Sequence, residues 1–235
     1  MLFTSYRFIT MLAFMPEGEH WSDILPTFFL GLRFDLRWIS IILLPIIIAS
    51  LIPGFSPFFS QRNRKIWTWY LAVVTFFIIF FFAADFGSFS YNRTRLGASA
   101  LNFVEDAGIS AKMLWQSYPI IWMLLGLFVS VILLRMMFRK LHKNVVLKTD
   151  GKGIPYKRKW FIGAIFFFGF LVYGNVGTQP LKWNTAFRFN NSFKSFLALN
   201  PLQNFFYTLK LRRTEYDETK ARSYFPLMQK WMGLD

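Results

Sequence analysis

Cysteine is absent from this chain of 235 residues, and histidine occurs only twice. Without a thiol, the protein has no disulfide framework, no cysteine nucleophile and no thiolate ligand for a metal. His20 and His142 are too few for a metal centre built from imidazoles, and the carboxylates that could replace them are scattered along the chain. We therefore expect no metal and no other cofactor in these 235 residues.

Acidic residues are also scarce, with 12 Asp and Glu against 27 Lys and Arg and a formal net charge of +15. A basic chain can bind nucleic acid when its positive residues share one face with aromatic side chains. Here the basic residues lie between long apolar runs, where positive charge sets the orientation of a membrane protein. We expect no nucleic acid partner.

Apolar sequence is abundant, since 54% of the residues are hydrophobic and 31 are Phe. A soluble domain intersperses charged and apolar residues, whereas this chain separates them into blocks, as membrane proteins with several spans do. About 20 apolar residues cross a hydrocarbon core, and roughly 17 can do so. The runs that we expect to cross the membrane lie at 36–52, 66–84, 119–138 and 160–176.

The first fifteen residues, MLFTSYRFITMLAFM, form a shorter apolar run that carries Arg7. The small-residue cleavage site of a signal peptide is lacking, so we expect a partial first span whose beginning is missing or mis-assigned. The predicted fold is an all-α polytopic membrane helix bundle over residues 1–176, with four full spans and the partial one. Residues 177–235 are expected to form juxtamembrane helices and a linker.

Basic loops predict the orientation of the bundle. The segment 135–159 contains nine Lys and Arg and one acid, and the segment 53–65 contains three and no acid. Positive loops are retained in the cytoplasm, so both segments are predicted to be cytoplasmic. Alternation of the spans then places the loops 16–35 and 85–118, and everything after residue 176, on the extracytoplasmic side.

The C-terminal segment contains a helix signal at Asn200 and Pro201, which fit the cap and the first position of a helix. The residues that follow at helical spacing are Leu202, Phe205, Phe206 and Leu209. This amphipathic helix is suited to lie at the membrane interface, and packing against the bundle is the alternative. The next segment, EYDETKARSYFPLMQKWMGLD, predicts a short charged helix that is broken at Pro226.

Charges also gather at the predicted outer mouths of the spans. In the stretch GLRFDLR, Arg33 and Asp35 are expected to pair within their own cluster or to meet lipid headgroups. In the stretch AADFGSFSYNRTRLG, Asp85 is expected to end its span, where a carboxylate reaches water. Asp35 and Asp85 are thus each predicted to form an ion pair at the membrane interface.

Arginine suits the recognition of lipid phosphate, because its planar guanidinium donates two parallel hydrogen bonds. Arg93 and Arg95 lie in the predicted outer loop, and Arg33 lies at the mouth of the first full span. We expect these three to contact the phosphate of a membrane phospholipid, and plain interface anchoring is the alternative. The chain contains no GxSxG, GxxxxGK[ST] or HExxH motif, so no catalytic residue is predicted.

Several stretches together resemble a known family. They are GLRFDL at 31–36, SYNRTRLGASALNFVEDAG at 90–108, MLWQSYPIIW at 113–122, LALNPLQNFFYTLK at 197–210 and ARSYFPLM at 221–228. In this order they resemble the N-terminal membrane domain of lipoteichoic acid synthase-like, sulfatase-type phosphoglycerol transferases of the alkaline phosphatase superfamily.

The resemblance implies five membrane helices, followed by a large extracytoplasmic domain that holds the Thr or Ser nucleophile and the divalent metal. The chain ends at Asp235, before the strand that begins that domain, so the family's catalytic residues have no counterparts here. The resemblance implies a non-catalytic anchor in the bacterial inner membrane, with its C-terminus outside and a missing or separate catalytic domain as its partner. At the N-terminus the chain departs from the family, because the first helix is short.

Two other functions are compatible with the sequence. The chain can be a standalone membrane scaffold or partner subunit, in which case no catalytic domain is attached to it. It can also be a small transporter, which requires polar or broken helices near the bilayer midplane. Pro45 with Ser40 and Ser50 is the thin support for a transporter.

Overall fold

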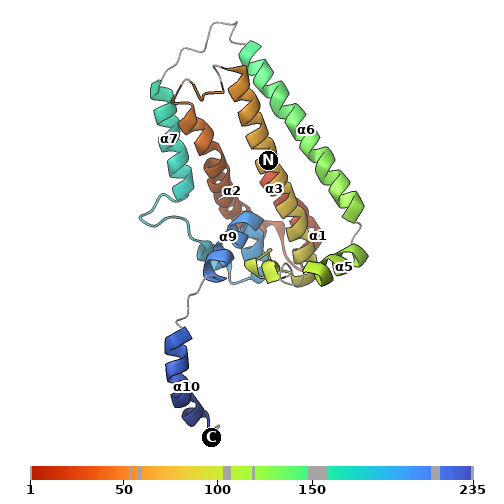
Figure 1. Cartoon of the computed structure of the whole chain (residues 1–235), viewed down its shortest axis with the longest axis vertical. Coiled ribbons are helices and arrows are strands. Elements are labelled where there is room, and N and C mark those ends of the chain that lie inside the picture. Colours follow the sequence, from red (N-terminus) through yellow and green to blue (C-terminus); the bar gives the residue numbers. More distant parts are fainter. Residues whose placement is uncertain are drawn as a thin grey trace.

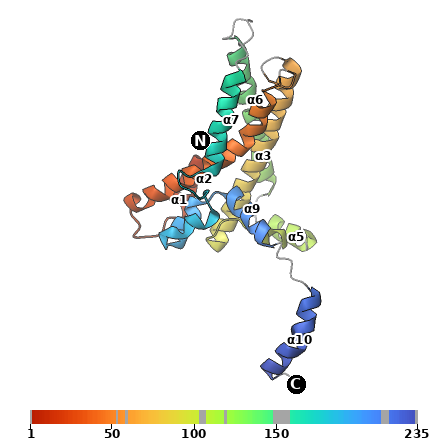
Figure 2. The ribbon, with the colours of Figure 1, turned by 90° about the vertical axis from the view of Figure 1, so that its left-hand side faces the viewer.

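The structure, a computed structural model, describes residues 2–52, 54–57, 60–102, 107–117, 120–147, 158–212 and 218–233. Within these residues all regular elements are helices, which confirms the predicted all-α class. Four long helices stand roughly upright in Figure 1, and the first of them runs obliquely in Figure 2. They are α2 (Trp21–Ala49), α3 (Gln61–Asn92), α6 (Ile120–Leu147) and α7 (Arg158–Tyr173).

The four long helices pack in two pairs, α2 with α7 and α3 with α6. One end of this group holds the end of α2, the start of α3, the end of α6 and the start of α7 (Figure 1). The opposite end carries the shorter helices. These are α5 (Ala107–Ser117), α8 (Ser192–Ala198), α9 (Pro201–Arg212) and the 3-10 helices η1 (Ala98–Leu101) and η2 (Trp183–Phe189).

Among the residues that the structure describes, two helices are long and apolar enough to cross a membrane, namely Gln61–Asn92 and Ile120–Leu141 within α6. The helix α2 is longer than the predicted span, but Arg33, Asp35 and Arg37 interrupt its apolar sequence. The 16 residues of α7 measure about 24 Å, less than the thickness of a typical hydrocarbon core. The first helix, α1 (Leu2–Phe14), is shorter still.

The helix α3 continues beyond the predicted end of its span, so Asp85 lies inside the helix and not at its end. Phe86 and Phe89 prolong the apolar side of α3, where both rings lie beside Phe14 of α1. The helix ends when Arg93 adopts the left-handed conformation, with φ of 57°, and donates its backbone N–H to Phe89.

Neither Pro45 nor Pro226 ends a helix. Pro45 lies inside α2, and Pro226 lies inside α10 (Glu218–Met232), so the predicted break at Pro226 is wrong. A proline inside a helix removes one backbone donor, but the residues on both sides of Pro226 keep their helical spacing. The helix α10 is therefore continuous.

The elements η2, α8 and α9, called here the platform, pack against the ends of the long helices. Asn200 caps α9 as predicted, because its Oδ1 accepts a 2.7 Å hydrogen bond from the N–H of Gln203. Leu202 joins a buried cluster with residues of α1 and α3, and the rings of Phe205 and Phe206 lie beside Phe81. The apolar side of α9 thus packs on the bundle, which was the alternative to an interfacial position.

Candidate functional site

Two buried ion pairs lie where the bundle meets the platform, and their arginines donate hydrogen bonds to carbonyls of α8. In the first, Arg7 of α1 meets Asp35 of α2 through two hydrogen bonds, Nη1 to Oδ2 at 2.6 Å and Nη2 to Oδ1 at 2.8 Å. Both side chains are at most 2% exposed. This parallel geometry gives the strongest form of an arginine–carboxylate contact.

Arg7 and Asp35 also form hydrogen bonds with residues in and beside the platform. Arg7 Nε donates to the carbonyl of Leu197 at 2.9 Å, and Asn200 Nδ2 donates to Asp35 Oδ1 at 3.2 Å. The guanidinium of Arg7 lies directly against Gly31, where a Cβ atom would collide with it. Only glycine at position 31 leaves room for this arrangement.

The second ion pair joins Asp85 of α3 to Arg95 in the segment that follows α3. Asp85 Oδ2 accepts 2.6 Å hydrogen bonds from Arg95 Nη1 and from the hydroxyl of Tyr6. Its Oδ1 accepts a 2.6 Å bond from the N–H of Leu96. Arg95 also donates Nε to the carbonyl of Phe196 at 2.8 Å.

The two ion pairs share neighbouring residues in α1 and in α8. Tyr6 and Arg7 are consecutive in α1, and their partners include different carboxylates. Phe196 and Leu197 are consecutive in α8, and their carbonyls accept from different arginines. We call the residues Tyr6, Arg7, Asp35, Asp85, Arg95 and Asn200 the buried ion-pair network.

Asn204 of α9 fastens the segment around Arg95 to the platform. Its Nδ2 donates to the carbonyls of Arg95 and Leu96 at 3.2 and 3.1 Å, and its Oδ1 accepts a 2.9 Å bond from Trp183 Nε1. The side chain is 4% exposed. A buried amide with these partners fixes one position of α9 relative to the end of α3.

A second pair of arginines binds the C-terminal end of α7. Arg37 donates Nε to the carbonyl of Val172 at 2.7 Å and Nη2 to that of Tyr173 at 3.0 Å. Arg33 donates Nε and Nη2 to the carbonyl of Gly174 at 3.0 and 2.7 Å. The last carbonyls of a helix lack donors within the helix and carry partial negative charge, so the two cations stabilise this end.

The predicted phosphate-binding arginines therefore occupy three different environments. Arg95 is buried and bonded to Asp85, and Arg33 is half-buried and bonded to Gly174. Arg93 is exposed, with its guanidinium carbon 5.1 Å from the ring centre of Phe14. Among the three, Arg93 presents its guanidinium to the surroundings, and its contact with a lipid phosphate stays a prediction.

The predicted pairing of Asp35 within its own cluster is corrected, because its partner is Arg7. Residues two positions apart on a helix point in different directions, so Arg33 and Arg37 turn to α7 while Asp35 turns to α1. Sequence reasoning assigned no role to Tyr6 or Arg7. An arginine inside an apolar run is itself a signal, since such a charge needs a partner in a neighbouring helix.

The network is suited to hold helices together. Each charge is compensated, and each carboxylate oxygen accepts at least one hydrogen bond. In the part of the chain that the structure describes, no group of three His, Asp or Glu residues lies close enough to hold a metal ion.

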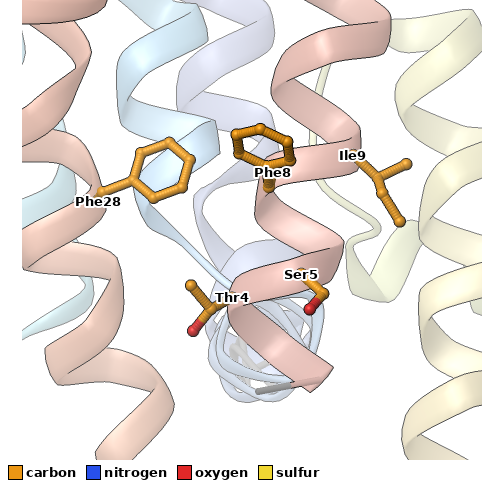
Figure 3. A pocket seen from close by; sticks show the side chains of 5 residues that line it. All are labelled: Thr4, Ser5, Phe8, Ile9 and Phe28. Atoms are coloured by element: carbon orange, nitrogen blue, oxygen red, sulfur yellow. The ribbon is translucent and has the colours of Figure 1, made fainter.

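A shallow groove runs between α1 and α2 (Figure 3). It is lined by Thr4, Ser5, Phe8, Ile9 and Phe28, and the ring of Phe28 points from α2 toward Phe8. Phe8 and Ile9 are 44% and 53% exposed. Its lining contains two hydroxyls and no titratable group, so it offers an apolar surface without acid–base chemistry.

The chain matches no protein-family model, and comparisons with curated proteins and with solved structures find no match either.

Proposed function

We propose that this chain is the membrane-anchoring part of a lipoteichoic acid synthase-like, sulfatase-type phosphoglycerol transferase. It positions an extracytoplasmic catalytic domain at the membrane that supplies a phosphoglycerol or related headgroup, and it performs no chemistry itself. The divalent metal and the nucleophile belong to that domain. Such anchoring raises the local concentration of the domain at its lipid substrate.

The single observation that carries the proposal is where the family-like stretches meet. Asp35 comes from the stretch at 31–36, Arg95 from that at 90–108, and Asn200 and Asn204 from that at 197–210. These residues are joined by the buried ion-pair network and by the contacts of Asn204. Three stretches that lie far apart in the sequence thus form one structural unit, which supports reading their resemblance as that of a whole domain.

The positions of the helix ends support a multi-pass arrangement. The basic residues at the start of α3 and in the last part of α6 lie at one end of the long helices, and the platform lies at the other (Figure 1). With the basic end in the cytoplasm, the platform and α10 lie outside, next to the outer leaflet. In this arrangement α2 and α7 complete the crossing together with α3 and α6, and α1 is a partial span.

The test reconstitutes the anchor and the chemistry separately. The chain is placed in liposomes that contain fluorescent phosphatidylglycerol, with and without the sulfatase-type domain encoded by the adjoining reading frame. We expect no headgroup transfer by the chain alone, and turnover roughly 100-fold higher for the anchored domain than for the free domain. Metal-dependent transfer by the chain alone would overturn the proposal.

The standalone subunit is separated from the anchor by the same experiment. An adjoining reading frame that encodes an unrelated protein, with no sulfatase-type domain that gains activity from the chain, favours a scaffold. A matched control joins the catalytic domain to an unrelated membrane helix. Lower turnover with this helix than with the chain assigns the platform a role beyond tethering.

A further inference from the structure

The helix α10 presents an apolar face that the other helices leave uncovered. It lies apart from the bundle in both views (Figures 1 and 2). Its large apolar side chains are between 55% and 90% exposed, and they are Tyr224, Phe225, Leu227, Met228, Trp231 and Met232. Their spacing of three, four and seven positions places them on one side of the helix. Arg222, Ser223 and Lys230 occupy the opposite side.

We infer that α10 lies flat on the anionic phospholipid surface of the membrane in which the bundle is inserted, with its apolar face immersed. This inference rests on the membrane insertion proposed above. It gives a binding partner to a segment for which the sequence predicted only a short, broken helix.

The composition of α10 fits a lipid surface. Lys220, Arg222 and Lys230 outnumber the one acid, Glu218, so the helix carries net positive charge and is attracted to anionic headgroups. Tyr224 and Trp231 add rings that combine an apolar body with a polar group, which favours the boundary between headgroups and acyl chains.

The chain also keeps α10 close to that surface. The last residue of α9 is Arg212 and the first of α10 is Glu218, so an extended connection spans at most about 20 Å. Since α9 packs on α3, this distance is counted from the end of a helix that contacts a candidate span. A tether of this length raises the effective concentration of the surface, so modest intrinsic affinity keeps the helix bound.

The absence of cysteine makes the test direct, because one introduced cysteine carries the only label. The full chain is labelled with an environment-sensitive fluorophore at Met228→Cys on the apolar face, or at Ser223→Cys on the polar face. Each protein is reconstituted in phosphatidylcholine vesicles with or without phosphatidylglycerol, and nitroxide-labelled acyl chains serve as quenchers.

We expect quenching about threefold stronger at position 228 than at 223 in vesicles that contain phosphatidylglycerol, and weaker quenching at 228 without it. Replacing Leu227 and Trp231 by Ser should abolish the difference between the positions. Arg222→Gln with Lys230→Gln should remove the dependence on phosphatidylglycerol.

Equal quenching at 228 and 223 would overturn the inference, as would equal quenching at 228 in both lipid mixtures. Energy transfer between differently labelled copies, without quenching by lipid, would also overturn it and identify a second copy of the chain as the occupant. Flotation of the chain with the vesicles reports insertion of the bundle separately. Loss of flotation contradicts the proposed anchor, whereas flotation without quenching at 228 contradicts only the inference on α10.

Discussion

The hydroxyl of Tyr6 donates a 2.6 Å hydrogen bond to Oδ2 of Asp85, 79 positions away in the sequence. The same oxygen accepts the hydrogen bond from Arg95, so one buried carboxylate joins α1, α3 and the segment that leads away from α3. A buried charge that loses its partner costs far more than an exposed one. The stability of the bundle should therefore depend sharply on these side chains.

Asp85→Asn keeps the shape of the side chain and removes its charge, which leaves the guanidinium of Arg95 buried without a counter-ion. We expect a loss of about 3–5 kcal/mol in the free energy of unfolding. The measurement is denaturant unfolding in detergent micelles, followed by circular dichroism. The matched control is Asp23→Asn, because Asp23 is exposed on the first turn of α2. Equal losses in the two variants would contradict a stabilising role for the pair.

The pair of Arg7 and Asp35 is suited to a double-mutant cycle with Arg7→Gln and Asp35→Asn. Each single change leaves one buried partner uncompensated, whereas the double variant leaves none. We expect the double variant to be more stable than the sum of the two losses predicts, with an interaction energy of about 0.5–3 kcal/mol. Additive losses would show that the two residues act independently.

Arg37→Gln should loosen the last turn of α7, because the carbonyls of Val172 and Tyr173 lose a charged donor. Hydrogen exchange measured by mass spectrometry is expected to speed up for amides near the end of α7 and to stay unchanged in α3. Arg37→Lys should restore protection only in part, since a lysine cannot donate to two carbonyls in a fixed fork. The control is Arg188→Gln at an exposed position.

Arg93 and Arg95 should respond differently to the same substitution. Arg93→Gln is expected to change the free energy of unfolding by no more than about 0.5 kcal/mol. It is also expected to reduce the retention of phosphatidylglycerol by the purified protein. Arg95→Gln is expected to destabilise the fold, because Asp85 then remains buried and unpaired. The lipid is measured by native mass spectrometry. Unchanged retention in Arg93→Gln would make that residue a plain interface anchor.

Local chemistry made much of the fold predictable. Asn200 and Pro201 marked the start of α9 because a side-chain cap and a fixed φ act within a few residues. The apolar runs identified the four long helices because each run must be removed from water. The ends were less predictable, as α3 shows, where the apolar run stops before Asp85 but the helix continues to Asn92.

The partners of the charges were not predictable from one sequence. Asp35 has two arginines within two residues, yet its partner is Arg7, because the direction of each side chain depends on how α1 and α2 pack. Likewise, Asp85 was expected to face water. It is buried instead, because Arg95 from the following segment donates a hydrogen bond to it and balances its charge. A sequence pattern gives the period of a helix, whereas pairing requires the distance between helices.

The network also bears on the order in which the protein is assembled during synthesis. Arg7 meets its carboxylate partner after 28 further residues have been made, but its partner carbonyl at Leu197 is 190 residues away. The charge of Arg7 can thus be compensated by a residue 28 positions away, whereas its hydrogen bond to α8 requires a segment 190 positions further along. The contacts of α8 therefore add to two helices, α1 and α2, that the ion pair of Arg7 and Asp35 can already join.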